Sequence, residues 1–218
     1  MTMFNHIVAI MPIKMINERL QGKNTMSLGG KPLLTYELEA LSAVDMIDKI
    51  IVYCSSEEIR SYLPEGVDFL KRPEYLDLPE SNFSQIFECF MSEVNADIYV
   101  YAHATAPFIK TETIVKCIEA VVSGDYDSAF CAERIQDYLW QDGKPLNFDA
   151  TNVPRSQDIK PIYRETSGIY VFKRKVFEEL HRRVGVNPFI AEVGYKESVD
   201  INYCADFDLA EKLLNIDL

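Results

Sequence analysis

The fold is decided by the stretch IVAIM at residues 7–11, which Pro12 closes and a polar loop follows. Five consecutive apolar residues that end at a proline predict a buried strand. The run has no basic leader and is far shorter than the roughly 20 apolar residues that cross a bilayer. We therefore expect the first strand of a sheet here, and neither a targeting segment nor a membrane span.

Similar apolar runs recur along the chain and alternate with segments of helical periodicity. Buried strands are predicted at residues 49–54, 97–102, 168–172 and 198–201. Proline at a first helical turn and polar caps predict helices that begin at Pro32, Ser56, Ser81 or Asn82, Thr111, and Asp206. This alternation predicts an α/β fold with a mostly parallel sheet flanked by helices.

Residues 138–164 interrupt this rhythm, because they are rich in Pro, Asn, Asp and Gln and show little periodicity. A long irregular piece inside a compact domain is usually functional, disordered or an interface. The length of 218 residues favours one domain. We expect that domain to cover residues 1–218, with 138–164 as a small extension within it.

Composition narrows the possible partners and the compartment. The 22 Lys and Arg residues against 34 Asp and Glu give a formal charge of −12, which disfavours electrostatic attachment to nucleic acid or to an anionic membrane. A local basic cluster can still bind phosphate. The cysteines contain no CxxC pair, so a disulfide framework or structural zinc is not expected and a reducing cytoplasm fits best; they are Cys54, Cys89, Cys117, Cys131 and Cys204.

The loop after the first strand concentrates positive charge through Lys14, Arg19 and Lys23. Ligands of open parallel sheets bind outside the carboxyl ends of the strands, which points to residues 14–24, 103–110 and the region of Asp200. Lysine, arginine and backbone amides near Gly22 suit phosphate oxygens. The loop matches neither GxxxxGK[ST] nor GxGxxG. On charge alone, an ordinary solvated basic loop is an equally good interpretation.

The same loop resembles the N-terminal signature of the acylneuraminate cytidylyltransferase family, roughly PARGGSKRxPGKN followed by GKPL. Pro12, Arg19, residues 22–24 and residues 30–33 match at the same spacing. The sequence departs from the signature at Lys14, Met15, Ile16, Asn17, Glu18 and Gln21. The resemblance covers nearly the whole chain and implies a Rossmann-like nucleotidyltransferase sheet with a small dimerisation extension at 138–164.

Further motifs of this family assign nucleotide contacts. Residues 69–73 followed by Ser81 and Asn82 resemble its RP…(T/S)S segment, and residues 103–108 take the place of QPTSPL, with His103 for the family's Gln. The resemblance implies that Lys14, Arg19 and Lys23 hold the triphosphate and, with Asp200, are catalytic. It implies nucleotide binding by Asn17, Asn24, Arg72, Ser81, His103 and Thr105. A structural role for His103 remains equally open.

The irregular extension carries a third match. Residues 155–158 and 163–170 resemble the family's RQD…YRENGAIY, where this region forms a dimer and helps bind the acidic sugar across the subunit boundary. The resemblance therefore implies that Arg155, Gln157 and Arg164 are substrate-binding residues. Arginine can hold a carboxylate through two parallel hydrogen bonds. The alternative is that either arginine forms an interface salt bridge.

Residues 198–207 resemble SxDIDxxxDF, whose first two aspartates hold magnesium in the family. Asp200 is retained, but Asn202 replaces the second aspartate. Side chains two apart on a strand project to one side, so both can meet one cation. The resemblance thus implies Mg²⁺ as cofactor with Asp200 and Asn202 as ligands, weakened because an amide carries no charge. Asp206 is predicted to be a helix N-cap.

These matches together predict a cytoplasmic, homodimeric cytidylyltransferase of nucleotide-sugar biosynthesis. It would transfer CMP from CTP to the anomeric hydroxyl of a sialic, legionaminic or related nonulosonic acid and release pyrophosphate. One alternative is an enzyme that activates 3-deoxy-octulosonate. Another, motivated by Asn202, His103 and the pair Met15-Ile16, is a catalytically weak homologue that only binds nucleotide or sugar.

Overall fold

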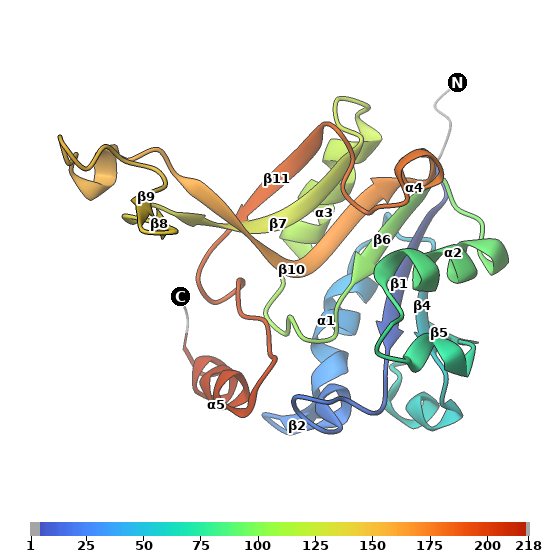
Figure 1. Ribbon diagram of the computed structural model, residues 1–218. Coiled ribbons are helices and arrows are strands. Elements are labelled where there is room, and N and C mark those ends of the chain that lie inside the picture. Colours follow the sequence, from blue (N-terminus) through green and yellow to red (C-terminus); the bar gives the residue numbers. More distant parts are fainter. Residues whose placement is uncertain (1–4, 217–218) are drawn as a thin grey trace.

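The computed structural model describes residues 5–216, so residues 1–4 and 217–218 of the expected domain lie outside the described part. A seven-stranded sheet forms its centre, in the order β11-β7-β10-β6-β1-β4-β5 (Figure 1). The strands are β1 (Ile7–Ile13), β4 (Lys49–Cys54), β5 (Val67–Lys71), β6 (Ile98–Ala102), β7 (Ser128–Ile135), β10 (Ile162–Lys173) and β11 (Pro188–Val193).

The sheet is mostly parallel, as predicted. β1 pairs in parallel with β4 and β6, and β4 pairs in parallel with β5. β10 is antiparallel to both of its neighbours, β6 and β7, whereas β11 is parallel to β7. A single reversed strand therefore joins two parallel groups, and the carboxyl ends of β1, β4 and β6 share one edge.

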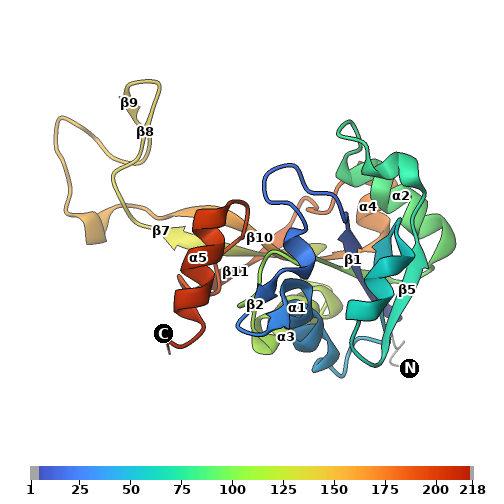
Figure 2. The ribbon, with the colours of Figure 1, turned by 90° about the horizontal axis from the view of Figure 1, so that it is seen from below.

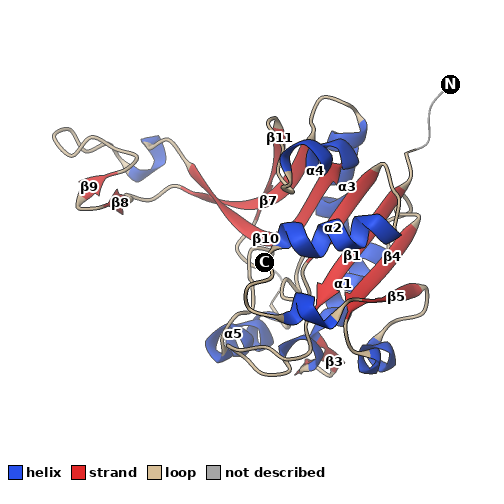
Figure 3. Cartoon of the chain, turned by 45° about the vertical axis from the view of Figure 1, so that its right-hand side comes forward, coloured by secondary structure: helices blue, strands red, loops and turns tan. Residues whose placement is uncertain are grey.

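Helices cover both faces of the sheet (Figures 2 and 3). α1 (Leu33–Ser42) and α3 (Thr111–Val122) pack on one face, and α2 (Phe83–Glu93) and α4 (Arg174–Leu180) pack on the other. Leu38 and Ile118 exemplify the first buried layer, and Phe87 and Phe177 the aromatic second layer. α5 (Cys204–Leu213) lies apart, over the hairpin of β2 (Ser27–Leu28) and β3 (Lys31–Pro32).

The prediction of a strand at residues 198–201 is wrong. Val199 and Ile201 are buried, but they pack beneath α5 with Leu28 and Leu33 rather than pairing with a sheet neighbour. A run of apolar residues indicates burial but not pairing in a sheet, and here the helix α5 buries the side chains. The strands β5, β7 and β11 were not anticipated, and the strand predicted at 168–172 is the last part of the longer β10.

The helix starts follow the predictions in part. Asn82 caps α2 by accepting a hydrogen bond from the Gln85 N–H, and Ser56 caps a 3-10 helix at Glu57–Tyr62. Thr111 is the first residue of α3 rather than its cap, and Pro32 precedes α1. Asp206 is three residues inside α5, where its carboxylate accepts the Tyr203 N–H at 2.8 Å. Each error is one to three residues, because side chains one turn apart satisfy the same free amides.

Residues 138–164 lie on an arm that leaves the body of the molecule (Figure 1). β7 and β10 pair as an antiparallel ribbon from Glu165–Ala132 to Ile162–Ile135, and the arm continues into the two-stranded pair β8 (Trp140–Gln141) and β9 (Lys144–Pro145). The register shifts between Glu165 and Tyr170, where an irregularity in the ladder bends a strand. β10 thus belongs to the body at one end and to the arm at the other.

Two expectations about the chain as a whole can be compared with the structure. All five cysteines are free thiols, and three of them are buried. Across residues 5–216, no helix combines the length and the apolar character needed to cross a bilayer.

Candidate active site

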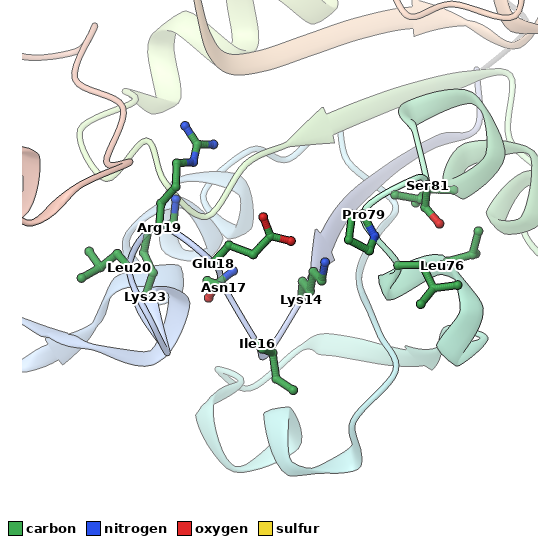
Figure 4. Close-up of a pocket in the computed structure, with 12 residues that line it drawn as sticks. Lys14, Ile16, Asn17, Glu18, Arg19, Leu20, Lys23, Leu76, Pro79 and Ser81 are labelled. Atoms are coloured by element: carbon green, nitrogen blue, oxygen red, sulfur yellow. The ribbon is translucent and has the colours of Figure 1, made fainter.

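A cleft of about 300 Å³ opens at the carboxyl end of β1 (Figure 4). One wall is the loop after β1, which contributes Lys14, Asn17, Arg19 and Lys23. The segment before α2 forms the other wall; it includes Leu76, Leu78, Pro79 and Ser81. The structure therefore brings the three predicted triphosphate cations together with two of the predicted nucleotide contacts.

Lys23 is the most constrained cation of this cleft. Gly22 takes a left-handed conformation, with φ 65°, that starts the 3-10 turn Lys23–Thr25 and turns the Lys23 side chain inward. The residue is 8% exposed, and its Nζ donates to the Ile201 carbonyl at 2.6 Å. Burial lowers the pKa of the Lys23 amine, while Asp200 opposes that shift. Lys23 thus connects the first loop to the C-terminal loop that holds Asp200.

Two asparagines of the loop have different roles. The Asn24 side chain is buried and donates from Nδ2 to the Lys14 carbonyl at 3.0 Å, so it fixes the path of the loop. Asn17 lines the cleft, and its buried Oδ1 has no hydrogen-bond partner among the described residues. An unsatisfied polar atom at a cleft wall is available to a ligand donor.

Of the two predicted nucleotide contacts Arg72 and Ser81, only Ser81 lies at the cleft. Ser81 lines the cleft and donates to the Tyr75 carbonyl at 3.1 Å. Arg72 is 2% exposed and forms an ion pair with Asp77, which also accepts a hydrogen bond from Ser55. One side of its guanidinium thus supports the segment before Ser81, while its buried Nε has no hydrogen-bond partner among the described residues.

A second cavity, also of about 300 Å³, contains the predicted metal ligands. The Asn202 amide donates to Asp200 Oδ2 at 2.7 Å, so the two side chains converge although they lie on a loop. Asp206 is occupied by the backbone N–H groups of Asn202 and Tyr203. No group of three or more His, Cys, Asp or Glu with metal-binding geometry exists within residues 5–216.

This donor set is compatible with Mg²⁺. Magnesium takes one or two protein carboxylates and completes its shell with waters and substrate phosphates. Asp200 supplies one carboxylate and Asn202 an amide group beside it, close to the Lys23 amine. Such a site depends on a nucleotide for its remaining oxygens.

His103 follows β6 and contacts a cation, Arg183. Its backbone N–H donates to Glu37 at 3.3 Å, and its ring Nε2 lies 3.4 Å from the Arg183 guanidinium. Burial, followed by Arg183 and Lys23, lowers the pKa of His103 to about 3. His103 is therefore a neutral imidazole near pH 7. Next to it, the Thr105 carbonyl accepts the Ile201 N–H at 2.9 Å, which fixes the loop of Asp200 against the end of β6.

The sequence analysis missed two charged residues here, Glu37 and Arg183. Glu37 is fully buried on α1, and burial raises the pKa of its carboxyl well above the usual range. Its place on the apolar face formed by Leu34, Leu38 and Leu41 was a signal that could have identified it. Arg183 follows α4 in a segment without any motif, so no local signal marks it.

The three predicted sugar-binding residues do not meet in one place. Arg155 and Gln157 lie on the arm, where Arg155 pairs with Asp158 at 2.8 Å and its side chain is 74% exposed. Arg164 lies at the base of the arm, pairs with Glu133 at 2.5 Å and lines the cavity of Asp200. Within one chain, the arm residues are separate from the cleft of Lys14 and Lys23.

The sequence is similar to those of known cytidylyltransferases. The sequence model of a family described as Cytidylyltransferase matches residues 8–216. The chain is 31% identical to the N-acylneuraminate cytidylyltransferase of Escherichia coli O18:K1:H7, over 94% of this chain and 51% of that protein. It is 26% identical to the CMP-N,N'-diacetyllegionaminic acid synthase of Legionella pneumophila, over 96% and 97%.

The chain spans about half the length of the first curated relatives it matches. Among solved structures, CMP:2-keto-3-deoxy-manno-octonic acid synthetase in complex with CTP superposes with a TM-score of 0.72 at 15% identity, over 96% of this chain and 98% of that one. This likeness confirms the nucleotidyltransferase-type architecture.

Proposed function

Because the chain belongs to the cytidylyltransferase family, we propose that it transfers CMP from CTP to the anomeric hydroxyl of an acidic 2-keto sugar and releases pyrophosphate. The names of the relatives support a sialic, legionaminic or related nonulosonic acid as the acceptor. The observation that carries the proposal is Lys23, a buried cation that joins a basic loop to the carboxylate of Asp200.

In this reaction the sugar hydroxyl attacks the α-phosphorus, the bond to the β-phosphate breaks and pyrophosphate leaves. Negative charge accumulates on the phosphate oxygens in the transition state. Positioned cations stabilise that charge, and the reaction needs no covalent intermediate with the protein. Lys14 and Arg19 hold the triphosphate from the open side of the cleft, and Lys23 holds it from beneath. Lys23 contributes most, because a charge in a buried, water-poor site acts more strongly.

The remaining wall residues orient the nucleotide. Asn17, with its unsatisfied Oδ1, accepts a hydrogen bond from the ligand, and the Ser81 hydroxyl contacts it from the opposite wall. Asn24 and Arg72 act indirectly, because each holds the backbone that carries these groups. His103 and Thr105 complete the edge at the end of β6.

Asp200, with Asn202 beside it, would hold Mg²⁺ when nucleotide is bound. The ion would neutralise phosphate charge and lower the pKa of the attacking hydroxyl. Asp206 fixes the backbone of this loop through two N–H groups, and Lys23 keeps the loop next to the triphosphate wall.

The arm is proposed to act between two copies of the chain. Trp140, Tyr138 and Val153 are exposed on it, and an exposed apolar surface on a projecting ribbon is typical of an interface. Arg155 and Gln157 would then reach the cleft of a second copy and contact its sugar. The five free cysteines support a reducing, cytoplasmic location.

The test measures pyrophosphate release from CTP and Mg²⁺ with N-acetylneuraminic, legionaminic, pseudaminic and 3-deoxy-octulosonic acids. We expect wild-type protein to turn over one of them and Asp200→Ala to lose roughly 100-fold or more. Asp208→Ala, an exposed position on α5, is the matched control and should keep full activity.

Two results would contradict the proposal. Equal activity of Asp200→Ala and Asp208→Ala would remove the role of Asp200. Absence of turnover with all four acids, while CTP still raises the melting temperature, would favour the binding homologue that Asn202, His103 and the pair Met15-Ile16 suggest.

A further inference from the structure

Arg183 is a half-buried cation at the ligand edge of the sheet that the proposed function does not yet use. It follows α4, and its guanidinium stacks 3.7 Å from the centre of the Tyr170 ring. The same guanidinium donates to the Tyr170 hydroxyl at 2.9 Å. One quarter of the side chain remains exposed. Stacking and a hydrogen bond thus fix the orientation of a charge that still reaches solvent.

The charge of Arg183 is only partly compensated. Within the described part of the chain, its one carboxylate neighbour by ion-pair distance is Glu165, at 3.4 Å. That contact is longer than the 2.7–2.9 Å of a strong ionic hydrogen bond. Glu165 also accepts the Tyr170 hydroxyl and lines the cavity that contains Asp200. Arg183 therefore has donor capacity left, next to a residue that lines that cavity.

His103 connects this cation to the triphosphate cleft. His103 Nε2 lies 3.4 Å from the Arg183 guanidinium, which carries only donors, so a neutral imidazole with its proton on Nδ1 suits this contact. Both Arg183 and Lys23 act on the His103 ring as positive charges. Two cations that act on one buried, neutral histidine mark a local positive region in a chain of net charge −12.

The chemistry of the acceptor sets where its carboxylate must lie. In a 2-keto acid sugar the carboxylate and the attacking hydroxyl are attached to the same anomeric carbon. The cation that binds the carboxylate must therefore stand close to the cations that hold the α-phosphate. Arg183, one imidazole away from the region of Lys23, meets this requirement within one chain, whereas Arg155 on the arm does not.

We propose that Arg183 binds the carboxylate of the acidic sugar and sets the preference of the site for acids over neutral sugars. This inference rests on the proposed function. Arg164 is less suited to the role, because it is already paired with Glu133 at 2.5 Å and its side chain is 56% exposed. Arg183 offers bidentate donors from a preorganised position.

The test compares the best acid of the panel with its carboxyl methyl ester, in wild-type protein, Arg183→Gln and Arg183→Lys. The ratio of kcat/KM for acid over ester should fall by about 10- to 100-fold in Arg183→Gln, the equivalent of one lost hydrogen bond to a charged group. The KM for CTP should stay unchanged. Arg182→Gln, which loses only a contact to the Gly185 carbonyl, is the matched control and should keep the wild-type ratio.

The ratio does not depend on how much of the variant is folded, so a merely structural role of Arg183 would leave it unchanged. If Arg183→Gln cannot be recovered folded, Arg183→Lys decides, since lysine lacks the two parallel donors and should lower the ratio several-fold. A wild-type ratio near one, or an unchanged ratio in the variants, overturns the inference alone. A wild-type protein that uses no acid overturns the proposed function and the inference together.

Discussion

The loop after β1 and the arm both carry cations that the sequence assigns to substrate binding. The cation of the loop is buried, whereas that of the arm is exposed. Lys23 is 8% exposed and reaches across the chain to the Ile201 carbonyl. The Arg155 side chain is 74% exposed, and its ion-pair partner, Asp158, is three residues away. The body thus completes its part of the site from distant segments of one chain. On the arm, Arg155 pairs only with a residue of the same short segment.

The difference follows from what supports each region. The first loop leaves a strand that is buried between two neighbours, and Asn24 ties its end back to Lys14. The arm is supported by the β7–β10 ribbon, by a short strand pair and by contacts of Tyr138 and Trp140 with Phe148. A ribbon with so little core is marginal by itself, so a second protein surface is the expected source of its order.

The largest effect is expected in the body. Lys23→Gln removes a buried charge that acts on the phosphates, and we expect kcat/KM with CTP to fall by about 100- to 1,000-fold. Lys31→Gln, an exposed lysine paired with Glu39, is the matched control and should change it little. Initial rates of pyrophosphate release measure both. Similar losses in the two variants would mean that burial of Lys23 is irrelevant to its role.

A smaller effect is expected in the arm, and it tests whether the two regions meet across subunits. Arg155→Gln should lower kcat/KM for the sugar by about 10- to 100-fold. Equal mixing with Lys23→Gln, after exchange of subunits, should restore about a quarter of the wild-type rate, because half of the dimers are mixed and each has one intact site. No recovery in a mixture shown to contain mixed dimers would place both residues in the same subunit's site.

The last prediction concerns folding stability rather than turnover, at Glu37 on α1. Burial raises the pKa of Glu37 above the ordinary value of 4.5, so the folded state holds a proton that the unfolded chain releases as the pH rises. Folding stability is therefore lost with rising pH above about 4.5, by up to about 1.4 kcal/mol per pH unit until the folded pKa is reached. Glu37→Gln should remove this loss, as measured by chemical denaturation at pH 4.5 and pH 8.

Glu39→Gln on the same helix is the control, because Glu39 is half exposed and pairs with Lys31. The gain in unfolding free energy should appear at pH 8 in Glu37→Gln alone and vanish at pH 4.5. A loss of stability at pH 8 would instead mean that the ionised carboxylate of Glu37 is stabilised by a buried partner.

Sequence reasoning succeeded where burial and pairing coincide. β4 was predicted with its observed bounds because Lys49–Cys54 is apolar from its second residue onward. β11 was missed because its apolar run, residues 188–191, is short and begins with a proline, and only Ala191 and Val193 are buried. The false strand at 198–201 shows the converse, since Val199 and Ile201 are buried by α5 without a sheet partner.

In the candidate site, motifs predicted some residues and no local pattern marked others. Motif positions predicted Lys14, Arg19, Lys23, Asn17 and Ser81, and the structure places all five along one cleft. Arg183 could not be anticipated, since its role depends on Tyr170 and His103, which reach it from β10 and the end of β6. Such contacts arise only when separate elements pack together.

The pairing of Ile135 with Ile162 has a consequence for how this protein can change over evolution. All 26 residues between them leave and re-enter the body at one adjacent pair of backbone positions. Insertions, deletions or replacement of that segment therefore leave the closure of the β7–β10 ladder intact. The sheet of the body can therefore keep its fold while the arm changes in length or sequence.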